Sequence, residues 1–351
     1  MKIDLENVGA LKRKVTITPG ALTIFTGGNN TGKTYAMYVL WALLAYRIKP
    51  DYTFTNTLLA RIRTEGSVQI PLSGFCRDYW QAIEAGIGEA LCSHLPKLFG
   101  AAPKFFRDAK IGVELDQPEL MQLAQATPNY ARIYEFGGQG RLDLRFTSFQ
   151  AKPAISITAI DIKDIPDEIL ADCIAALITA IVLDSHAKRA FLLPAERGGL
   201  NLFYDDLIPG RNITSSRASI GPKDLPISEE RRDLMVTRHA QPLEDYIQFL
   251  KEARHIVTHD VQFHDLALSL QSSIAKVDYK VSADGIVTAQ PHNSEQALGI
   301  HLASSTVKNL YGLWAWLESQ AVPGSFLMID EPELNLHPDN QRHVARLLVR
   351  L

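Results

Sequence analysis

The sequence has few cysteines and no excess of basic charge. Its 351 residues include three cysteines, which form neither a Cys-x-x-Cys pair nor a Cys/His metal pattern. Isolated cysteines are typical of free thiols in a reducing compartment, which argues against a secreted fold held by disulfides. The formal net charge is −3, so the field of the whole chain does not attract nucleic acid. A nucleic-acid contact would need a local basic patch or the groove of a dimer.

Long apolar runs are also missing. The longest, residues 36–46 and 173–183, are shorter than the roughly 20 residues that span a bilayer. The N-terminal residues contain no apolar core of a signal peptide. We therefore expect a cytoplasmic protein that does not use a membrane. The length and the ordinary globular composition predict two domains, or one domain with insertions.

What the sequence does contain is a glycine-rich loop between a strand-like run and a helix-like run. Residues 26–35 read TGGNNTGKTY and fit G-x-x-x-x-G-K-[ST]. Glycines allow the backbone to wrap so that its N–H groups face phosphate oxygens. Lys33 is then expected to reach the β and γ phosphates, and the Thr34 hydroxyl to bind Mg²⁺. A glycine-rich turn with an exposed lysine is the alternative. The predicted ATP-binding residues are Gly27, Asn29, Asn30, Thr31, Gly32, Lys33, Thr34 and Tyr35.

A second motif supplies the acids that a phosphate loop needs. In FLMIDEP, four apolar residues lead to Asp330 and Glu331. We predict a buried strand that ends in two carboxylates, with Asp330 holding Mg²⁺ partly through water. Glu331 would act as the general base that activates the attacking water, and with Lys33 it forms the predicted catalytic pair. The alternative is a strand that ends in a solvated acidic turn.

Periodicity and turn residues predict an α/β fold with the ATPase core divided along the sequence. Strands are expected at 2–9 (an edge strand), 14–20 and 21–25, with an apolar helix at 34–48. A three-stranded meander is expected over 129–160, a helix at 166–189, a short strand from 190, a helix at 242–254, a hairpin at 276–290 and an amphipathic helix at 304–319. A final helix is expected from 340.

The predicted domains are 1–50 (core with the phosphate loop), 51–128 (helical insertion), 129–200 (meander with a core helix and strand), 201–275 (exposed loop and helices) and 276–351 (core with the acid pair).

Together, GGNNTGKT at 27–34 and LMIDEPELNLHP at 327–338 resemble the ABC-type ATPase heads of the SMC, Rad50 and RecF group. More narrowly, the chain resembles the AAA15/AAA21 ATPases related to OLD proteins. The double asparagine in the loop, the segment LLPAERGGL at 192–200 and the LHP after the acids support the narrower match. The resemblance covers residues 1–45, about 189–200 and 298–340.

This resemblance implies a P-loop ABC-ATPase head, with a mixed sheet, an antiparallel β lobe and a mostly helical insertion. It implies Mg²⁺-ATP bound between two heads of a homo-oligomer, and a partner effector or nuclease protein in anti-phage defence. The signature position then falls at LASST, where Ser304 or Ser305 would contact the partner head's γ-phosphate. The usual glycine is missing there, and an N-cap role for Ser304 is the alternative.

Three further residues are candidate site residues, although the motifs around them are less specific. Arg197 in PAERGG either senses phosphate or a partner, or pairs with Glu196 or surface acids. His337 is expected to cap a helix or pack at the head interface, and Gln150 is the candidate for the Q-loop. In the group that the chain resembles, a strand and a switch histidine follow the last helix, and here the chain ends at Leu351. We expect the native protein to continue, and this chain alone to hydrolyse ATP poorly.

Two other groups of residues could suggest a function. His255, His259 and His264, with Asp260 and Asp265, lack the spacing of a metal motif and favour a polar exposed segment. A basic segment within the expected loop over 205–240 would favour a DNA-engaging ATPase, but acids interleave with it and favour a solvated loop. A scaffold that binds ATP and hydrolyses little of it is the third hypothesis. The basic residues are Arg211, Arg217, Lys223, Arg231, Arg232 and Arg238, and the acids are Asp224, Glu229, Glu230 and Asp233.

Overall fold

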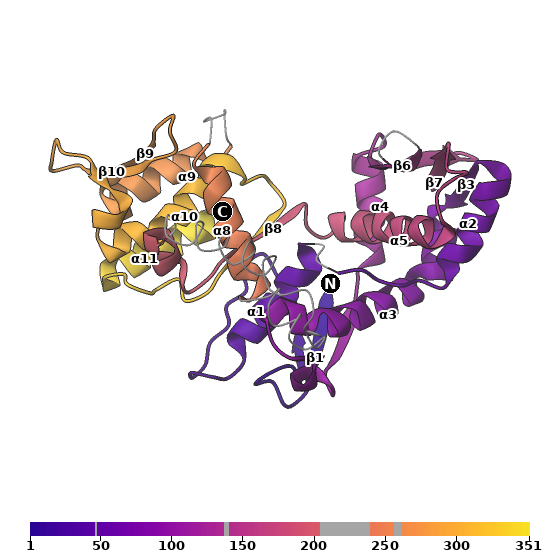
Figure 1. Cartoon of the computed structure of the whole chain (residues 1–351), viewed down its shortest axis with the longest axis horizontal. Coiled ribbons are helices and arrows are strands. Elements are labelled where there is room, and N and C mark those ends of the chain that lie inside the picture. Colours follow the sequence, from indigo (N-terminus) through magenta and orange to yellow (C-terminus); the bar gives the residue numbers. More distant parts are fainter. Residues whose placement is uncertain (46–47, 137–139, 204–238, 256–261) are drawn as a thin grey trace, which may run out of the picture. The chain divides into compact units, whose positions relative to one another are not determined.

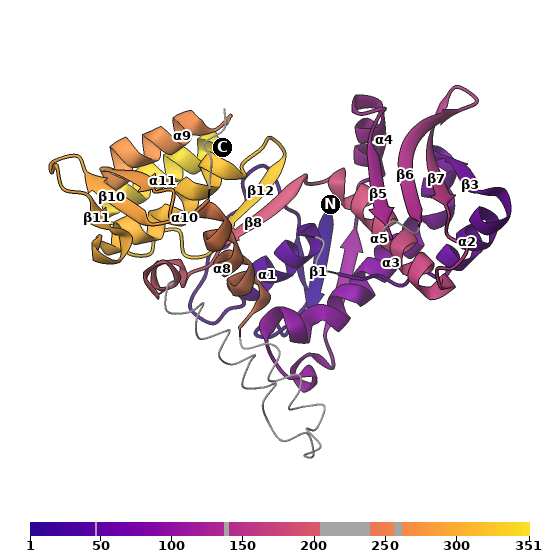
Figure 2. The ribbon, with the colours of Figure 1, turned by 45° about the horizontal axis from the view of Figure 1, so that its top comes forward.

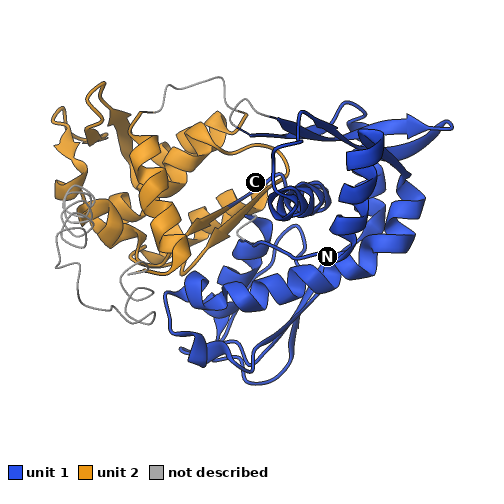
Figure 3. Ribbon diagram, turned by 45° about the vertical axis from the view of Figure 1, so that its right-hand side comes forward, with its two compact units in different colours: residues 1–190 blue, residues 191–351 orange. Residues whose placement is uncertain are grey.

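The computed structural model describes residues 1–45, 48–136, 140–203, 239–255 and 262–351. These residues form two compact units, Met1–Ala190 and Phe191–Leu351 (Figure 3). The boundary falls within strand β8 (Arg189–Leu193). The basic segment and most of the loop expected over 205–240 lie outside the described residues, as do His259 and Asp260.

The first unit contains a sheet of three antiparallel strands, β2 (Val15–Ile17), β1 (Lys2–Glu6) and β4 (Lys110–Glu114), in that order. Ile3 and Leu5 are fully buried on one face of β1. The prediction that the first strand lies at an edge was wrong, because β1 pairs on one side with β2 and on the other with β4. Figure 1 shows β1 near α1 (Lys33–Leu44) and the long helix α3 (Leu72–Phe99).

The strand expected at residues 21–25 is not formed. Residues 18–27 belong to no helix or strand, and the side chains of Leu22 and Ile24 are 55% and 71% exposed. A strand is stabilised by its ladder of hydrogen bonds and by cross-strand side-chain pairs, and among the described residues this segment pairs with no other strand. By contrast, the apolar helix that follows the loop is confirmed as α1, with every residue from Ala36 to Leu44 buried.

The predicted meander is confirmed and gains a fourth strand. Its antiparallel sheet has the order β3 (Ser67–Pro71), β7 (Lys152–Ile160), β6 (Arg141–Phe149) and β5 (Ala131–Glu135). Figure 2 shows these strands side by side, with α2 (Phe54–Glu65) and α5 (Asp167–Asp184) next to them. The region 51–128 therefore contributes β3 and β4 to sheets, besides α2, α3, the 3₁₀ turn η1 (Pro103–Phe106) and α4 (Gln117–Ala126).

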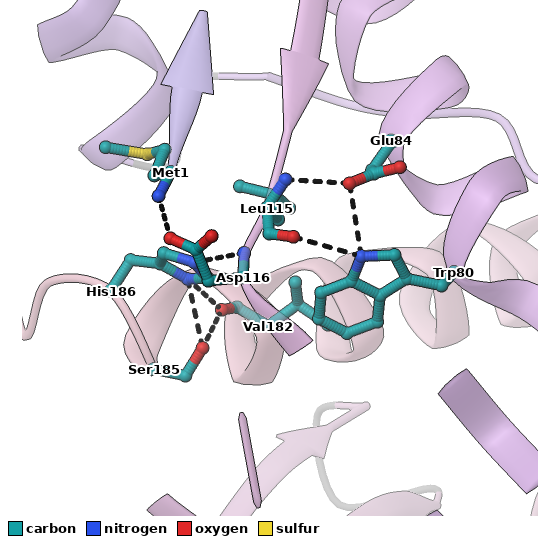
Figure 4. Close-up of polar contacts among 8 residues, drawn as sticks. All are labelled: Met1, Trp80, Glu84, Leu115, Asp116, Val182, Ser185 and His186. Atoms are coloured by element: carbon teal, nitrogen blue, oxygen red, sulfur yellow. Dashed lines mark hydrogen bonds and ion pairs between the residues drawn. The ribbon is translucent and has the colours of Figure 1, made fainter. Parts of the chain in front are cut away.

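Polar contacts join the end of β4 to the end of α5 and to α3 (Figure 4). The Asp116 N–H donates to Nε2 of His186 at 3.0 Å, and Asp116 also forms an ion pair with the amino group of Met1. Because Nε2 accepts this hydrogen bond, the imidazole proton lies on Nδ1, which is 3.1 Å from the Val182 carbonyl oxygen. Nearby, Glu84 Oε1 accepts from the Leu115 N–H at 2.7 Å and from the Trp80 indole at 3.1 Å.

This arrangement predicts that the protein loses stability in mild acid. Burial lowers the pKa of His186 from its usual 6.5. Below pH 6.5 the unfolded chain therefore binds a proton at this residue that the folded chain does not, and the free energy of unfolding falls as the pH drops toward the folded pKa. We expect the urea midpoint to fall between pH about 7.5 and about 5.5 by more in the wild type than in His186→Gln, whose amide oxygen accepts the same bond without titrating. Equal falls in both proteins would contradict this assignment.

The second unit is built around α10 (Ser305–Ser319). It also contains β8, β12 (Ser325–Ile329), α8 (Gln241–Ala253), α9 (His264–Ser269), the π-helical turn η2 (Leu270–Ala275), β9 (Val277–Val281), β10 (Val287–Pro291), β11 (Leu298–Gly299), the 3₁₀ turn η3 (Ile300–Leu302) and α11 (Pro338–Arg350). The expected hairpin is confirmed as β9 and β10, and Gly285 takes a φ of +77° in its turn. The helix expected at 304–319 is confirmed as α10, but its predicted amphipathic character was wrong, because α10 is buried on most sides. It contacts α8, α9, η2 and η3.

The expectation of a mixed sheet is not confirmed. Every pairing in the sheets β2-β1-β4, β3-β7-β6-β5 and β11-β10-β9 is antiparallel. The fourth sheet consists of β12 and β8. Within the described part of the chain, no helix has both the length and the apolar character needed to cross a membrane.

Candidate functional site

The glycine-rich loop curls around the side chain of its own lysine. The Lys33 ammonium donates to the carbonyl oxygens of Gly27 and Gly28 at 3.0 and 2.7 Å, and the Thr31 hydroxyl donates to the Gly28 carbonyl at 2.9 Å. Positive φ angles at Gly27 (148°), Asn30 (58°) and Gly32 (97°) turn the backbone. The ammonium therefore lies within the turn of the loop, where a point charge can neutralise a bound anion.

Helix α1 begins directly after this loop, with Gly32 as its N-cap residue. The structure shows neither a side-chain cap there nor an acidic residue in the first turn. The first amide groups of a helix have no intrahelical acceptor and carry its positive dipole end. The described residues thus present an uncapped helix N-terminus next to a lysine ammonium, and this combination suits a phosphate group. Asn29, Asn30 and Thr31 are exposed along the loop, while Thr34 and Tyr35 are half-buried in the first turn of α1.

Close packing against the turn after β1 fixes the start of α1. Val8 and Leu11 exchange backbone hydrogen bonds at 3.1 and 3.0 Å. A Cβ added to Gly32 would lie 2.4 Å from Cδ2 of Leu11, and one added to Gly9 would lie 2.0 Å from Cε1 of Tyr35. Both positions therefore require glycine, and the loop rests on a neighbouring turn that lies earlier in the sequence.

We expect Gly32→Ala to destabilise the protein, because it disturbs the close packing of residue 32 against Leu11. The new Cβ meets the Leu11 side chain and also occupies a φ of +97°, and a left-handed non-glycine residue costs on the order of 1–3 kcal/mol. Gly28→Ala is the matched control in the same loop, because its Cβ would meet its nearest atom, Cγ2 of Thr31, at 3.9 Å. Urea unfolding should show a lower midpoint for Gly32→Ala than for Gly28→Ala. Equal midpoints would mean that Leu11 does not constrain the loop.

The acid pair follows β12 directly. The Asp330 N–H donates to the Leu193 carbonyl of β8 at 2.9 Å, and the Leu334 N–H donates to the Glu331 carbonyl at 3.0 Å. Glu331 takes a φ of +47°, and its side chain is exposed, whereas Asp330 is half-buried. The expected strand is therefore present, but it is less buried than predicted, with only Met328 fully covered. Its pairing with β8 alone among the described strands leaves more of its surface exposed.

Arg197 is buried, which contradicts the expected pairing with surface acids, while its role as a sensor of phosphate or of a partner stays a prediction. It begins a helical stretch over 197–203, and only 3% of its surface is exposed. Its guanidinium donates to the carbonyl oxygens of Pro194 (3.0 Å), Asp330 (2.6 Å) and Glu331 (2.8 Å). Burial lowers the pKa of Arg197, while nearby acidic groups, among them Asp330 and Glu331, act in the opposite direction.

Ser304 is the N-cap of α10, and its hydroxyl oxygen accepts from the Val307 N–H at 3.3 Å. This confirms the capping alternative, and the predicted γ-phosphate contact of Ser304 or Ser305 stays a prediction. Both serine side chains are exposed.

Sequence reasoning missed two other side chains of α10. Thr306 donates to the Asn335 carbonyl at 2.8 Å, and Asn309 donates to the Leu334 carbonyl at 2.9 Å.

His337 is the N-cap of α11, where its Nδ1 accepts from the Asp339 N–H at 3.4 Å. Its capping role is thus confirmed, and a role at a head interface stays a prediction. Gln150 occupies the two-residue turn between β6 and β7 with a φ of 51°, and its role in a Q-loop stays a prediction. His264 contacts the buried Glu318 at 3.0 Å. The described residues contain no group of three His, Cys, Asp or Glu that could hold a metal.

Comparison with known proteins supports one family. Residues 163–351, more than half of the chain, match the family described as "AAA domain, putative AbiEii toxin, Type IV TA system". The match includes Arg197, Ser304, Asp330 and Glu331, and it begins after the loop that contains Lys33. No curated protein and no solved structure shows a significant match. The chain therefore belongs to this AAA-domain family of P-loop ATPases.

Proposed function

We propose that the protein binds Mg²⁺-ATP and hydrolyses it to ADP and phosphate. The observation that carries this proposal is the loop at 27–34, in which the Lys33 ammonium sits inside the turn beside an uncapped helix N-terminus. These groups suit the triphosphate of a nucleotide because they combine a point charge with oriented amide groups. The match of residues 163–351 to the AAA-domain family supports the same activity.

The residues divide into binding and chemical roles. Lys33 and the loop would hold the phosphates, and the Thr34 hydroxyl and the Asp330 carboxylate would hold Mg²⁺. Bound Mg²⁺ neutralises charge on the phosphates. Glu331, exposed at the end of β12, would accept a proton from the attacking water. Ser304 or Ser305 would contact the γ-phosphate of a second head.

We further propose that nucleotide binding assembles at least a head-to-head dimer and that this assembly controls a partner effector or nuclease protein. The exposed N-terminus of α10, which begins at Ser305, is available for contact with a second head. The family's description names a toxin of a toxin–antitoxin system, which is in keeping with a role in anti-phage defence. A DNA-engaging ATPase and a nucleotide-gated scaffold are the competing functions.

Phosphate release as a function of protein concentration tests the proposal. If two heads form each site, the rate per molecule should rise with protein concentration and then level off. A constant rate per molecule would support a site within one chain. Tight Mg²⁺-ATP binding without turnover would favour the scaffold, and stimulation by DNA would favour the DNA-engaging function. No binding of ATP would refute all three.

A further inference from the structure

The acidic turn, defined here as Asp330–Asn335, is held by side chains from two other elements of the second unit. Arg197 binds the carbonyl oxygens of Asp330 and Glu331 at the start of the turn. Asn309 and Thr306 of α10 bind the carbonyl oxygens of Leu334 and Asn335 at its end. Each contact is to the backbone of the turn, so these bonds hold its conformation without engaging the exposed Glu331 carboxylate.

Glu331 has a backbone conformation that it would not adopt without support. Its φ of +47° lies in the left-handed region, which side chains with a Cβ rarely occupy. Strained positions of this kind persist when the surrounding structure fixes them. Because the Cα–Cβ bond direction depends on φ, a return of Glu331 to negative φ would send its carboxylate in another direction.

The contacts of Arg197 are those that only a guanidinium can make in one plane. One terminal nitrogen, Nη1, reaches the carbonyl oxygens of both Pro194 and Asp330, while the other, Nη2, reaches the Glu331 carbonyl oxygen. A lysine ammonium has the same charge but lacks this rigid planar fork. The burial of Arg197 keeps water from competing for these carbonyl groups.

We propose that Arg197 is a positioning residue that sets the direction of the Glu331 carboxylate by holding the carbonyl groups of the two peptide units that flank the Glu331 Cα. Arg197 touches neither nucleotide nor water in this role and acts through Glu331. The inference rests on the proposed function, because it assigns to Arg197 the orientation of the proposed general base.

The test uses Arg197→Lys, with Arg63→Lys as the matched control. Arg63 likewise donates to backbone carbonyls, those of Ile162 and Ile165 at 2.8 and 2.7 Å, but in the first unit. Hydrogen exchange without nucleotide is the first measurement. We expect the amides of the acidic turn, including those of Asp330 and Leu334, to exchange about tenfold faster in Arg197→Lys than in wild type. Arg63→Lys should leave the exchange of this turn unchanged. Unchanged exchange in Arg197→Lys would overturn the proposal.

Kinetics provide the second measurement. We expect Arg197→Lys to lower kcat about tenfold or more, with KM for ATP within about twofold of wild type. In a Glu331→Gln background the same change should have little further effect, because a residue that acts through Glu331 has no base left to orient. An equal loss of kcat in both backgrounds would refute the positioning role. If wild type hydrolyses no ATP, the proposed function fails, and hydrogen exchange alone then decides whether Arg197 fixes the turn.

Discussion

Replacing Glu331 by Gln is expected to lower kcat for ATP hydrolysis by about 10²–10⁴-fold, the usual contribution of a general base. Gln has nearly the same shape as Glu but does not accept a proton from water. Binding of Mg²⁺-ATP should persist, because the phosphate loop at 27–34 and Asp330 are unchanged. The structure supports this separation, since the Glu331 side chain is exposed while its backbone is held by Arg197 and by the Leu334 N–H.

Glu333→Gln is the control for this experiment. Glu333 is exposed in the same turn, and its carbonyl accepts from the Leu336 N–H at 3.1 Å. It does not directly follow β12, so its neutralisation should leave kcat within about twofold of wild type. Phosphate release at saturating Mg²⁺-ATP measures turnover, and calorimetry measures ATP affinity. Turnover by Glu331→Gln close to that of Glu333→Gln would remove Glu331 from the chemistry.

Local patterns identified the elements whose structure depends on neighbours in the sequence. The hairpin of β9 and β10 follows from alternating residues and from Asp284-Gly285, because glycine takes the positive φ at low energy. The apolar run of α1 and the cap at Ser304 are similarly local. The loop at 27–34 could be located from its spacing alone, since a phosphate loop is a contiguous segment.

Partners that are distant in the sequence were not predictable in this way. Strand β1 lies inside its sheet because it pairs with β4, far along the chain, and no local pattern identifies this partner. Residues 21–25 form an apolar run like that of a buried strand, yet they have no pairing partner among the described residues. The close packing of Gly32 against Leu11 likewise depends on a turn that lies earlier in the chain. No local pattern indicates that this turn contacts the loop.

The residues that contact the acidic turn were likewise not predictable from local sequence patterns. PAERGG indicated that Arg197 senses phosphate or a partner, or pairs with Glu196 or surface acids. It gave no sign of the three carbonyl groups that bind Arg197, because they come from two separate segments. One available signal was overlooked. Asn309 lies in the middle of an apolar helix, and a polar amide at such a position usually needs a specific hydrogen bond. That signal predicts a contact from α10, although it does not identify the Leu334 carbonyl as the acceptor.

Replacing Lys33 by Ala should have the second large effect, a loss of affinity for Mg²⁺-ATP of about 10–100-fold. A charged hydrogen bond is typically worth about 1.5–3 kcal/mol, and Lys33 is the only cationic side chain in the loop at 27–34. Lys14→Ala removes the same charge from an exposed lysine that pairs with Asp4 and should leave ATP affinity unchanged. Calorimetric titration with Mg²⁺-ATP measures both variants.

AMP distinguishes the two ways in which Lys33 could act. Its ammonium also closes the loop by bonding the carbonyl oxygens of Gly27 and Gly28, so the substitution could weaken binding simply by loosening the loop. AMP lacks the β and γ phosphates that Lys33 is predicted to contact. If Lys33 binds those phosphates, Lys33→Ala should reduce the affinity for ATP far more than that for AMP, and added salt should weaken ATP binding less in the variant than in wild type. A similar loss for both nucleotides would instead assign Lys33 to the shape of the loop, because only that role is independent of the number of phosphates.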